Sequence, residues 1–512
     1  MSAPGLDPTF SDLPHRRLGD VALARAQELG ATHADFRLER VRYQYLGARD
    51  GILQTASDAE DLGFAVRVVH GGAWGFASAV VLTDDEARRV AETAVAVARV
   101  AAAMTTIPVE LAPEPVHDDV TWVSAYDINP LEVPTREKAD LLVDWTERLR
   151  EGAAVAHATA FLQQVQENKY YADLSGTRTT QQRVRLQPGF EATGDDEQTG
   201  IFDSMASIAP PAGRGWEYLT GTHWDWDAEI AEVPDLLAEK LKAPSVAAGT
   251  YDLVVHPSNL WLTIHESVGH ATELDRALGY EANYAGTSFA TYDKLGTLRY
   301  GSEVMNVQGD RTQEHGLATI GYDDEGVETQ RWDIVRDGVL VGYQLDRAMA
   351  HLKPELSGLD SGQGRSNGCA YADSSGHIPI QRMANVSLLP GVDELSTDDL
   401  IGRVERGIYV VGDKSWSIDM QRFNFQFTGQ RFYTIENGRL GGMLRDVAYQ
   451  ATTTDFWGSM EAVGGPDTWV LGGAFNCGKA QPGQVAAVSH GCPTSLFRGV
   501  NILNTIDEAG HR

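Results

Sequence analysis

The chain has 512 residues, of which 42% are apolar and 22% charged, a balance typical of a folded globular protein. Its formal net charge of −30 argues against nonspecific nucleic-acid binding and favours neutral or basic ligands. No apolar run is long enough to span a bilayer, and the N-terminus lacks a basic-then-apolar signal pattern, so we expect no membrane partner. Three cysteines argue against a disulfide framework and predict a reducing, cytoplasmic setting.

The first half of the chain has the pattern of a mixed helix and strand scaffold. Thr83 and Glu86 form a capping-box pattern, and Asp50-Gly51 is a hairpin turn signal. The expected helices cover 13–29, 83–103 and a long segment that begins near 135. The expected strands, arranged as antiparallel hairpins, lie at 35–41, 43–46, 52–54, 63–69 and within 155–209. We therefore predict an N-terminal α/β domain with antiparallel hairpins and long helices.

A stretch that mixes Pro, Gly and Trp separates this half from the rest, at 210–247. We place the domain boundary there, with a scaffold domain at 1–245 and a catalytic domain at 246–512. In the second domain two Asx-Gly dipeptides, at 337–338 and 437–438, sit between strand-like runs and predict hairpins. We expect a largely antiparallel β domain that carries a helix with two histidines, and an α+β fold class overall.

The strongest chemical signal is the sequence His265-Glu266-Ser-Val-Gly-His270. Neutral imidazole is a good Zn²⁺ ligand, and a carboxylate beside bound water can take its proton. The familiar zinc-protease spacing places two histidines four residues apart, on one helix face. Here they are five apart, which is about 140° around a regular α-helix. A single π-type turn would bring the rings together, and Gly269 lies where such a distortion costs little.

A catalytic zinc site needs a third protein ligand. The nearby carboxylates and the thiols that could supply it are Glu273, Asp275, Glu281, Cys369, Cys477 and Cys492. Glu273 follows His270 by three residues, so we expect it to support that histidine or to be solvated. A thiolate is a strong Zn²⁺ ligand, although an isolated cysteine is more often a buried apolar residue. Sequence favours Cys477 slightly, because small residues surround it and Lys479 would favour the thiolate.

Further sequence blocks accompany the histidine motif. They are Gly63-Phe-Ala-Val-Arg-Val, Gly72-Ala-Trp-Gly-Phe, Asp323-Asp-Glu-Gly-Val, Gly338-Val-Leu-Val-Gly-Tyr, His377-Ile-Pro-Ile-Gln-Arg-Met-Ala-Asn, Leu389-Pro-Gly, Ile435-Glu-Asn-Gly, Cys477-Gly-Lys and Gly491-Cys-Pro-Thr. With these blocks the chain resembles, over nearly its whole length, the TldD/PmbA family of zinc metalloproteases, on its catalytic TldD-like side. Single blocks are weak signals, but their combination is specific.

The resemblance implies a site and an activity. It makes His265, His270 and Cys477 the ligands of one Zn²⁺ per chain and Glu266 the general base. It implies hydrolysis of extended peptides inside a chamber closed by dimerisation, with the first domain also serving dimerisation. The partner would be a second copy or a TldE/PmbA-like paralogue. The chain departs from the pattern in a longer segment at 275–288, which bears on substrate choice, and in having a thiol at Cys492.

Other roles and other functions stay open at this stage. An oxyanion needs a donor besides the metal, and His377, Arg365 and Tyr433 are candidates without a ranking. A thiol hydrolase would use Cys492 with His490, although their spacing and the adjacent proline disfavour a dyad. A metal-dependent amidohydrolase of small molecules would use the same chemistry in a closed pocket. A non-catalytic scaffold subunit of a heteromeric protease is the remaining alternative.

Overall fold

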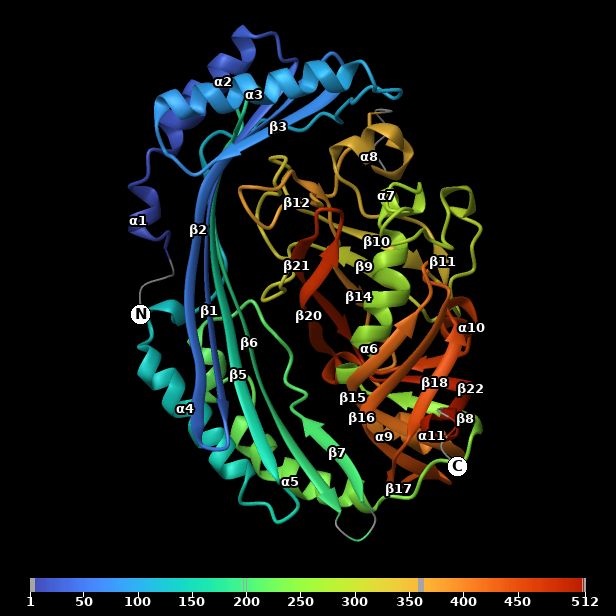
Figure 1. Ribbon diagram of the computed structural model, residues 1–512. Coiled ribbons are helices and arrows are strands. Elements are labelled where there is room, and N and C mark those ends of the chain that lie inside the picture. Colours follow the sequence, from blue (N-terminus) through green and yellow to red (C-terminus); the bar gives the residue numbers. More distant parts are fainter. Residues whose placement is uncertain (1–4, 197, 199, 358–362, 509, 511–512) are drawn as a thin grey trace.

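The computed structural model describes residues 5–196, 198, 200–357, 363–508 and 510, and it combines helices with mainly antiparallel sheets (Figure 1). This confirms the α+β class expected from the sequence. Among the described residues, no helix is both long and apolar enough to cross a membrane.

The first half is built on a long curved sheet whose central strands run most of the length of the molecule (Figure 1). The strand order is β3-β2-β1-β5-β6-β4, with β7 beside β6. The strands are β1 His33–Arg49, β2 Ile52–His70, β3 Ala73–Ala79, β4 Val120–Val123, β5 His157–Asp173, β6 Arg178–Asp196 and β7 Ile201–Ala206. The separate short strands expected before residue 50 are one strand, β1. β2 and β5 pair with it along nearly its whole length, so its backbone groups have partners on both sides apart from a register shift against β2 at Gly47 and Ala48.

Helices cover this sheet at its two ends. They are α1 Pro8–Ser11, α2 His15–Glu28, α3 Asp84–Ala102, α4 Thr135–Leu149 and α5 Trp226–Lys242. The helices α2 and α3 pack over one end of the sheet, and α4 and α5 cover the other end (Figure 1). Thr83 caps α3 as predicted, because its side chain accepts a hydrogen bond from the backbone N–H of Glu86, whereas the Glu86 side chain, expected to complete a capping box, pairs with Arg89. Each end has its own apolar core.

The second half contains a seven-stranded sheet in the order β15-β8-β22-β18-β16-β17, with β19 beside β22, together with smaller sheets. The strands of all these sheets are β8 Gly249–Val255, β9 Val307–Asp310, β10 Arg331–Arg336, β11 Val339–Leu340, β12 Ala370–Tyr371, β13 Ile380–Gln381, β14 Asn385–Leu388, β15 Arg406–Ile418, β16 Asn424–Glu436, β17 Arg439–Leu444, β18 Val447–Thr452, β19 Met460–Val463, β20 Val470–Lys479, β21 Gln484–Cys492 and β22 Ser495–Asn504. The helices are α6 Pro257–Ile264, α7 Leu274–Ala277, α8 Arg347–Leu352, α9 Thr397–Gly402, α10 Thr453–Gly458 and α11 Thr505–Glu508.

The two predicted Asx-Gly turns join β10 to β11 and β16 to β17, and both of their residues have positive φ. Sheet is less extensive than expected between β9 and β14, where the strands are short. Side chains there form hydrogen bonds with backbone groups that a longer sheet would pair with a neighbouring strand. The Asp323 carboxylate, for example, accepts hydrogen bonds from the backbone N–H groups of Glu325, Val327 and Ala370.

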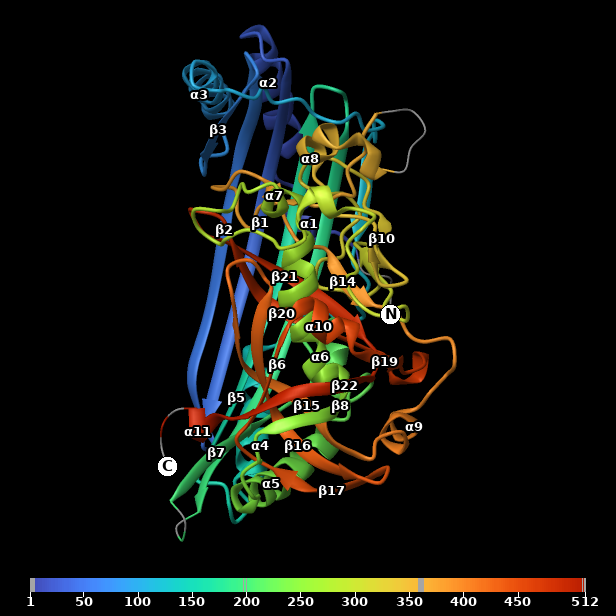
Figure 2. The same ribbon diagram turned by 90° about the vertical axis from the view of Figure 1, so that its right-hand side faces the viewer.

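Buried ion pairs join the two halves of the chain. Lys169 on β5 donates to Asp324 at 2.8 Å, and Arg67 on β2 pairs with Glu325 at 3.0 Å. All four side chains are at most 4% exposed, and such charges are tolerated in the interior only when they are paired. Figure 1 and the view turned by 90° in Figure 2 show the second half lying against one face of the long sheet. The domain boundary near residue 245 stays a prediction.

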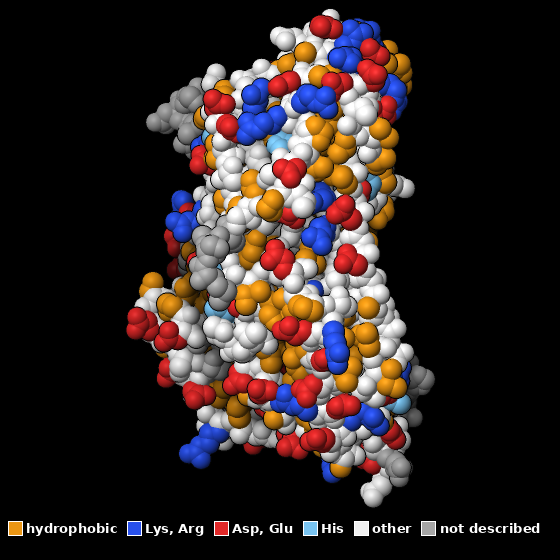
Figure 3. Space-filling model, turned by 90° about the vertical axis from the view of Figure 1, so that its left-hand side faces the viewer, with side chains coloured by type: hydrophobic (Ala, Val, Ile, Leu, Met, Phe, Trp, Pro, Cys, Tyr) orange, Lys and Arg blue, Asp and Glu red, His pale blue; other side chains and the backbone are white. Residues whose placement is uncertain are grey.

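The outer face of the first half carries acidic and basic side chains interspersed with apolar ones (Figure 3). The charged side chains on this face are thus exposed to solvent, as is usual for the surface of a globular protein.

Candidate metal centre

A π-helical turn places the two histidines of the motif side by side. The helix α6 ends at Ile264, and residues His265–Gly269 form one π turn closed by a hydrogen bond from the His270 N–H to the His265 carbonyl. The ring centroids of His265 and His270 are therefore 4.7 Å apart. The turn is the distortion that the five-residue spacing predicts. Gly269 is needed for close packing, since a Cβ there would lie 2.6 Å from Met383 Sδ.

The third group comes from β20, more than 200 residues further along the chain. Cys477 Sγ lies 3.5 Å from His270 Nε2. One potential ligand atom from each of His265, His270 and Cys477 lies within 4.8 Å of the others. All three side chains are at most 5% exposed. The structure thus brings together the three residues that the sequence proposes as ligands.

Hydrogen bonds to the far side of each ring fix which nitrogen faces this cluster. His490 Nδ1 donates to the Val386 carbonyl at 2.8 Å, so its Nε2 accepts from His265 Nδ1 at 2.7 Å. His270 Nδ1 donates to the Glu273 carboxylate at 3.0 Å. Both motif rings therefore carry the proton on Nδ1 and direct an unprotonated Nε2 toward the sulfur. Burial lowers the pKa of His270 to about 3, which keeps that ring neutral.

Glu273 is itself held in a buried ionic cluster. Lys479 Nζ lies 3.2 Å from its carboxylate and 2.8 Å from that of Asp275, and Arg276 Nε lies 3.4 Å from Glu273. Lys479 therefore pairs directly with carboxylates, and its charge also lowers the pKa of the Cys477 thiol, in the direction expected from the sequence. Burial raises the pKa of Cys477 to about 11, far more than Lys479 lowers it. A thiolate there would need a cation to replace the proton.

The carboxylate of Glu266 lies in the same π turn and is 6% exposed. Burial raises its pKa, although the Arg422 guanidinium, 2.5 Å away, opposes this shift. Arg422 was missed by the sequence reasoning, because nothing in its local sequence marks it. The role of His490 was also missed: the sequence flags Ser-His-Gly-Cys only as a possible thiol site.

The three expected oxyanion donors make contacts elsewhere. His377 Nδ1 donates to Asp373 at 2.6 Å, and its carbonyl accepts from Arg37 on the long sheet. Arg365 forms an ion pair with Glu114 at 2.9 Å. The ring of Tyr433, on β16, stacks on that of Tyr409 with centroids 6.4 Å apart. The oxyanion role of His377, Arg365 and Tyr433 stays a prediction, and these contacts lend it no support.

The thiol-hydrolase alternative finds no support either. Cys492 is fully buried, and its thiol lies 3.6 Å from the Pro257 carbonyl. Both nitrogens of His490 are engaged with other groups. Cys369 is also fully buried, and burial raises its pKa to about 12. Neither thiol is arranged as an activated nucleophile.

Sequence comparison identifies the family of this site. The sequence model of the PmbA/TldA metallopeptidase C-terminal domain matches residues 248–504, and that of PmbA/TldA metallopeptidase domain 1 matches residues 34–98. The chain belongs to the TldD/PmbA family. The matched segments include the histidine motif and Cys477, so the resemblance inferred from the sequence is confirmed.

Curated relatives in the TldD/PmbA family are named as metalloproteases. A metalloprotease of Methanocaldococcus jannaschii is 26% identical over 84% of this chain and 89% of its own. A zinc metalloprotease TldD homolog of Saccharolobus solfataricus is 23% identical over 92% of this chain and 96% of its own. The crystal structure of TldE from Thermococcus kodakarensis has the same fold, with a TM-score of 0.68 and 17% identity over 95% of this chain and 99% of its own.

The donor set fits a zinc ion. Two imidazole nitrogens with free lone pairs and one thiolate match the Cys/His ligand types of catalytic zinc sites, which keep a fourth position open. The hydrogen bonds from His265 to His490 and from His270 to Glu273 match the outer partners that orient metal-bound imidazoles. A site built only for hydrogen bonding would have no need of two unprotonated nitrogens facing one sulfur.

Proposed function

We propose that this chain is a zinc-dependent metallopeptidase in which His265, His270 and Cys477 hold one Zn²⁺ per chain and Glu266 is the general base. The observation that carries the proposal is the convergence of the three ligand atoms within 4.8 Å, beside a buried carboxylate. The Saccharolobus relative is named a zinc metalloprotease, which supports zinc as the metal.

The residues of the chain divide the work of peptide-bond hydrolysis. A bound zinc would supply the Lewis acidity that polarises the scissile carbonyl and lowers the pKa of bound water to near neutrality. Glu266 accepts one proton from the attacking water and returns it to the leaving amine, so that the peptide and one water give a carboxylic acid and an amine. The burial that raises its pKa brings this carboxylate closer to the neutral range in which such exchange is efficient. Glu273 and His490 hold the two imidazoles in orientation.

We propose that the substrate is an unfolded or extended peptide. β20, which carries Cys477, pairs only with β21 among the described strands, so its other edge has no strand partner there, although the Cys477 carbonyl accepts a hydrogen bond from Arg382. Main-chain pairing along a free edge accepts many sequences, and side-chain pockets then supply modest preference. The closed chamber would be completed by a second copy or by a TldE/PmbA-like paralogue. The fold shared with a protein named TldE supports this partnership, and the cytoplasmic setting stays a prediction.

The test is digestion of an unstructured protein alongside small amide substrates, before and after chelator treatment. We expect the unstructured protein to be cleaved, chelator to stop cleavage, and Zn²⁺ to restore it. Glu266→Gln should retain zinc and lose at least about 100-fold in kcat, because the amide cannot take the proton. Cleavage of small amides only would favour the amidohydrolase alternative. Zinc-free, inactive wild-type protein would favour the scaffold subunit, and full activity of Glu266→Gln would remove Glu266 from its role.

A further inference from the structure

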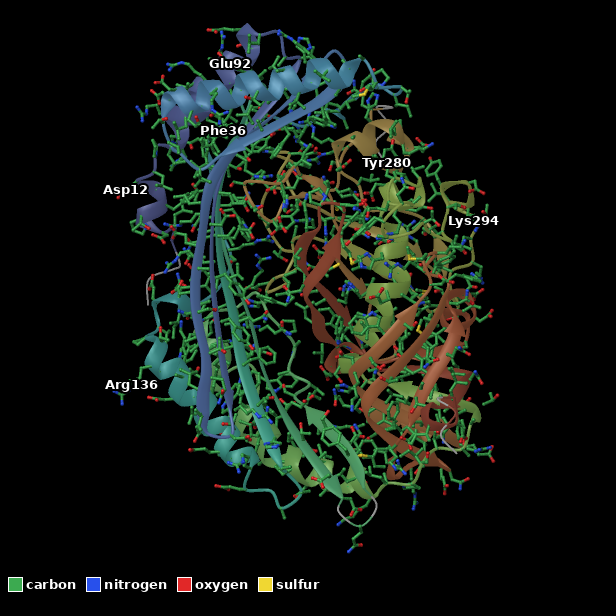
Figure 4. All side chains as sticks on the ribbon, viewed as in Figure 1. Asp12, Phe36, Glu92, Arg136, Tyr280 and Lys294 are labelled. Atoms are coloured by element: carbon green, nitrogen blue, oxygen red, sulfur yellow. The ribbon has the colours of Figure 1, made fainter. Side chains whose placement is uncertain are left out.

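The segment at 275–289, which includes the stretch at 275–288 that is expected from the sequence to be longer than in the family pattern, ends against a loop of the second half. Beyond α7 the chain runs through Tyr280, whose side chain is 58% exposed, toward Lys294 (Figure 4). At the end of this segment, the backbone N–H of Thr287 donates to the Met420 carbonyl at 2.9 Å. The N–H of Phe289 donates to the Gln421 carbonyl at 2.9 Å. The segment at 275–289 is thus tied to the turn at 419–422 by the main chain.

This turn holds Arg422 in a single backbone conformation. The Asp419 carboxylate accepts hydrogen bonds from the N–H groups of Gln421, Phe423 and Asn424, at 2.8–3.0 Å. Arg422 has φ +64°, in the left-handed region that non-glycine residues seldom adopt. Its carbonyl accepts from Thr453 Oγ1 at 2.8 Å. Strain of this kind persists when the surroundings fix the conformation, and it often marks a functional position.

The side chain of Arg422 forms an ion pair with the Glu266 carboxylate. Its Nη1 lies 2.5 Å from Glu266 Oε2, and the side chains are 15% and 8% exposed. Arg422 Nε is buried and has no hydrogen-bond partner in the described part of the chain. The guanidinium thus binds one carboxylate oxygen, Oε2, and the Trp416 side chain is a second hydrogen-bonding neighbour of the same carboxylate. A carboxylate on a flexible side chain is best positioned when one of its oxygens is fixed in this way.

We propose that Arg422 is a positioning residue for Glu266, and that the segment at 275–289 sets its place through the turn at 419–422. This inference rests on the proposed peptidase function. Arg422 fixes Glu266 Oε2, so that Oε1 accepts the proton of the attacking water and later delivers it to the leaving nitrogen. This segment thereby acts on the rate of the chemical step as well as bordering the site.

Arg422→Ala, compared with wild type, tests the side chain. We expect kcat to fall about 100-fold or more with KM changed by less than about threefold, because a misplaced base affects the chemical step. Zinc content should stay at the wild-type value, whereas the thermal midpoint should fall, because Glu266 loses its buried partner. Arg422→Lys should recover part of kcat, since it keeps the charge without the rigid fork. Arg445→Ala is the matched control: that side chain is 19% exposed and paired with Asp446 at 3.0 Å.

Gly286→Ala tests the segment. A Cβ at Gly286 would lie 2.1 Å from the Met420 carbonyl oxygen, so the turn must move. Gly296→Ala is its control, because Gly296 also has positive φ, +74°, and a Cβ there meets nothing within 4 Å. We expect Gly286→Ala to lose kcat as Arg422→Ala does, with zinc retained, and Gly296→Ala to keep it. In the double variant with Arg422→Ala the two losses should not add.

A double variant with Glu266→Gln shows whether Arg422 acts through that carboxylate. We expect Arg422→Ala to cause no further loss of single-turnover rate in the Glu266→Gln background. Full additivity there, wild-type kcat in Arg422→Ala, or loss of zinc in parallel with kcat would overturn the inference while leaving the peptidase function intact. Absence of chelator-sensitive cleavage in the wild-type protein would instead refute the proposed function, and the inference with it.

Discussion

Glu273→Gln tests the ionic cluster that supports His270. In the protein the Glu273 carboxylate accepts from His270 Nδ1 at 3.0 Å and lies within 3.4 Å of both Lys479 and Arg276. A glutamine keeps one acceptor oxygen, but its NH₂ group replaces the other oxygen and would face these donors, which it cannot accept from. Removing one member of a buried ionic cluster costs about 3–5 kcal/mol of stability. Losing the partner that orients a ligand lowers metal affinity about 10–100-fold, or about 1.4–2.8 kcal/mol.

Two measurements separate these effects. The thermal midpoint of the metal-free protein reports the loss of stability, and competition with a chelator reports the affinity for Zn²⁺. Glu303→Gln is the matched control, because that side chain is 82% exposed and paired with Arg299 at 3.0 Å, and surface pairs contribute at most about 1 kcal/mol. An affinity for Zn²⁺ within twofold of wild type in Glu273→Gln would refute the view that Glu273 orients His270.

Two further substitutions test other parts of the structure. His490→Phe leaves the His265 Nδ1–H and the Val386 carbonyl without partners, at about 1–3 kcal/mol each, so both the thermal midpoint and Zn²⁺ affinity should fall; unchanged affinity in chelator competition would contradict the assigned orientation of His265. Burial lowers the pKa of His256 to about 4, below its ordinary value near 6.5, so between these values the folded state binds fewer protons than the unfolded state. Stability should therefore fall as the pH falls through this window, by at most about 1.4 kcal/mol per pH unit. The variant His256→Asn keeps an acceptor that can cap the helix, and its thermal midpoint should depend less on pH between 6.5 and 4.5 than that of wild type. A slope equal to that of wild type would contradict this.

Local patterns were enough to predict much of the architecture. The capping Thr83, the two Asx-Gly hairpins and the five-residue histidine spacing each depend on neighbouring residues, and each has the expected structure. Strand lengths in the first half were underestimated. The pairing of β1 with β2 and β5 along nearly its full length is a tertiary feature that short windows do not contain.

The chemistry of the site divides in the same way. Sequence brings His265, Glu266 and His270 together within six residues, whereas the choice of Cys477 among three thiols leaned on a family resemblance. Arg422 and His490 meet the motif only through folding, across 156 and 225 residues of chain. Such partners carry no signal in a single sequence, because their effect depends on burial and on the direction of one hydrogen bond.

The metal content per chain, measured for wild type and Cys477→Ala, tests the central claim most directly. We predict about one Zn²⁺ per chain in the wild-type protein, less than about a tenth of that in Cys477→Ala, and full occupancy in Cys492→Ala, whose thiol is equally buried but lies against the Pro257 carbonyl. An unchanged zinc content in a folded Cys477→Ala protein would contradict the claim that this sulfur completes the site.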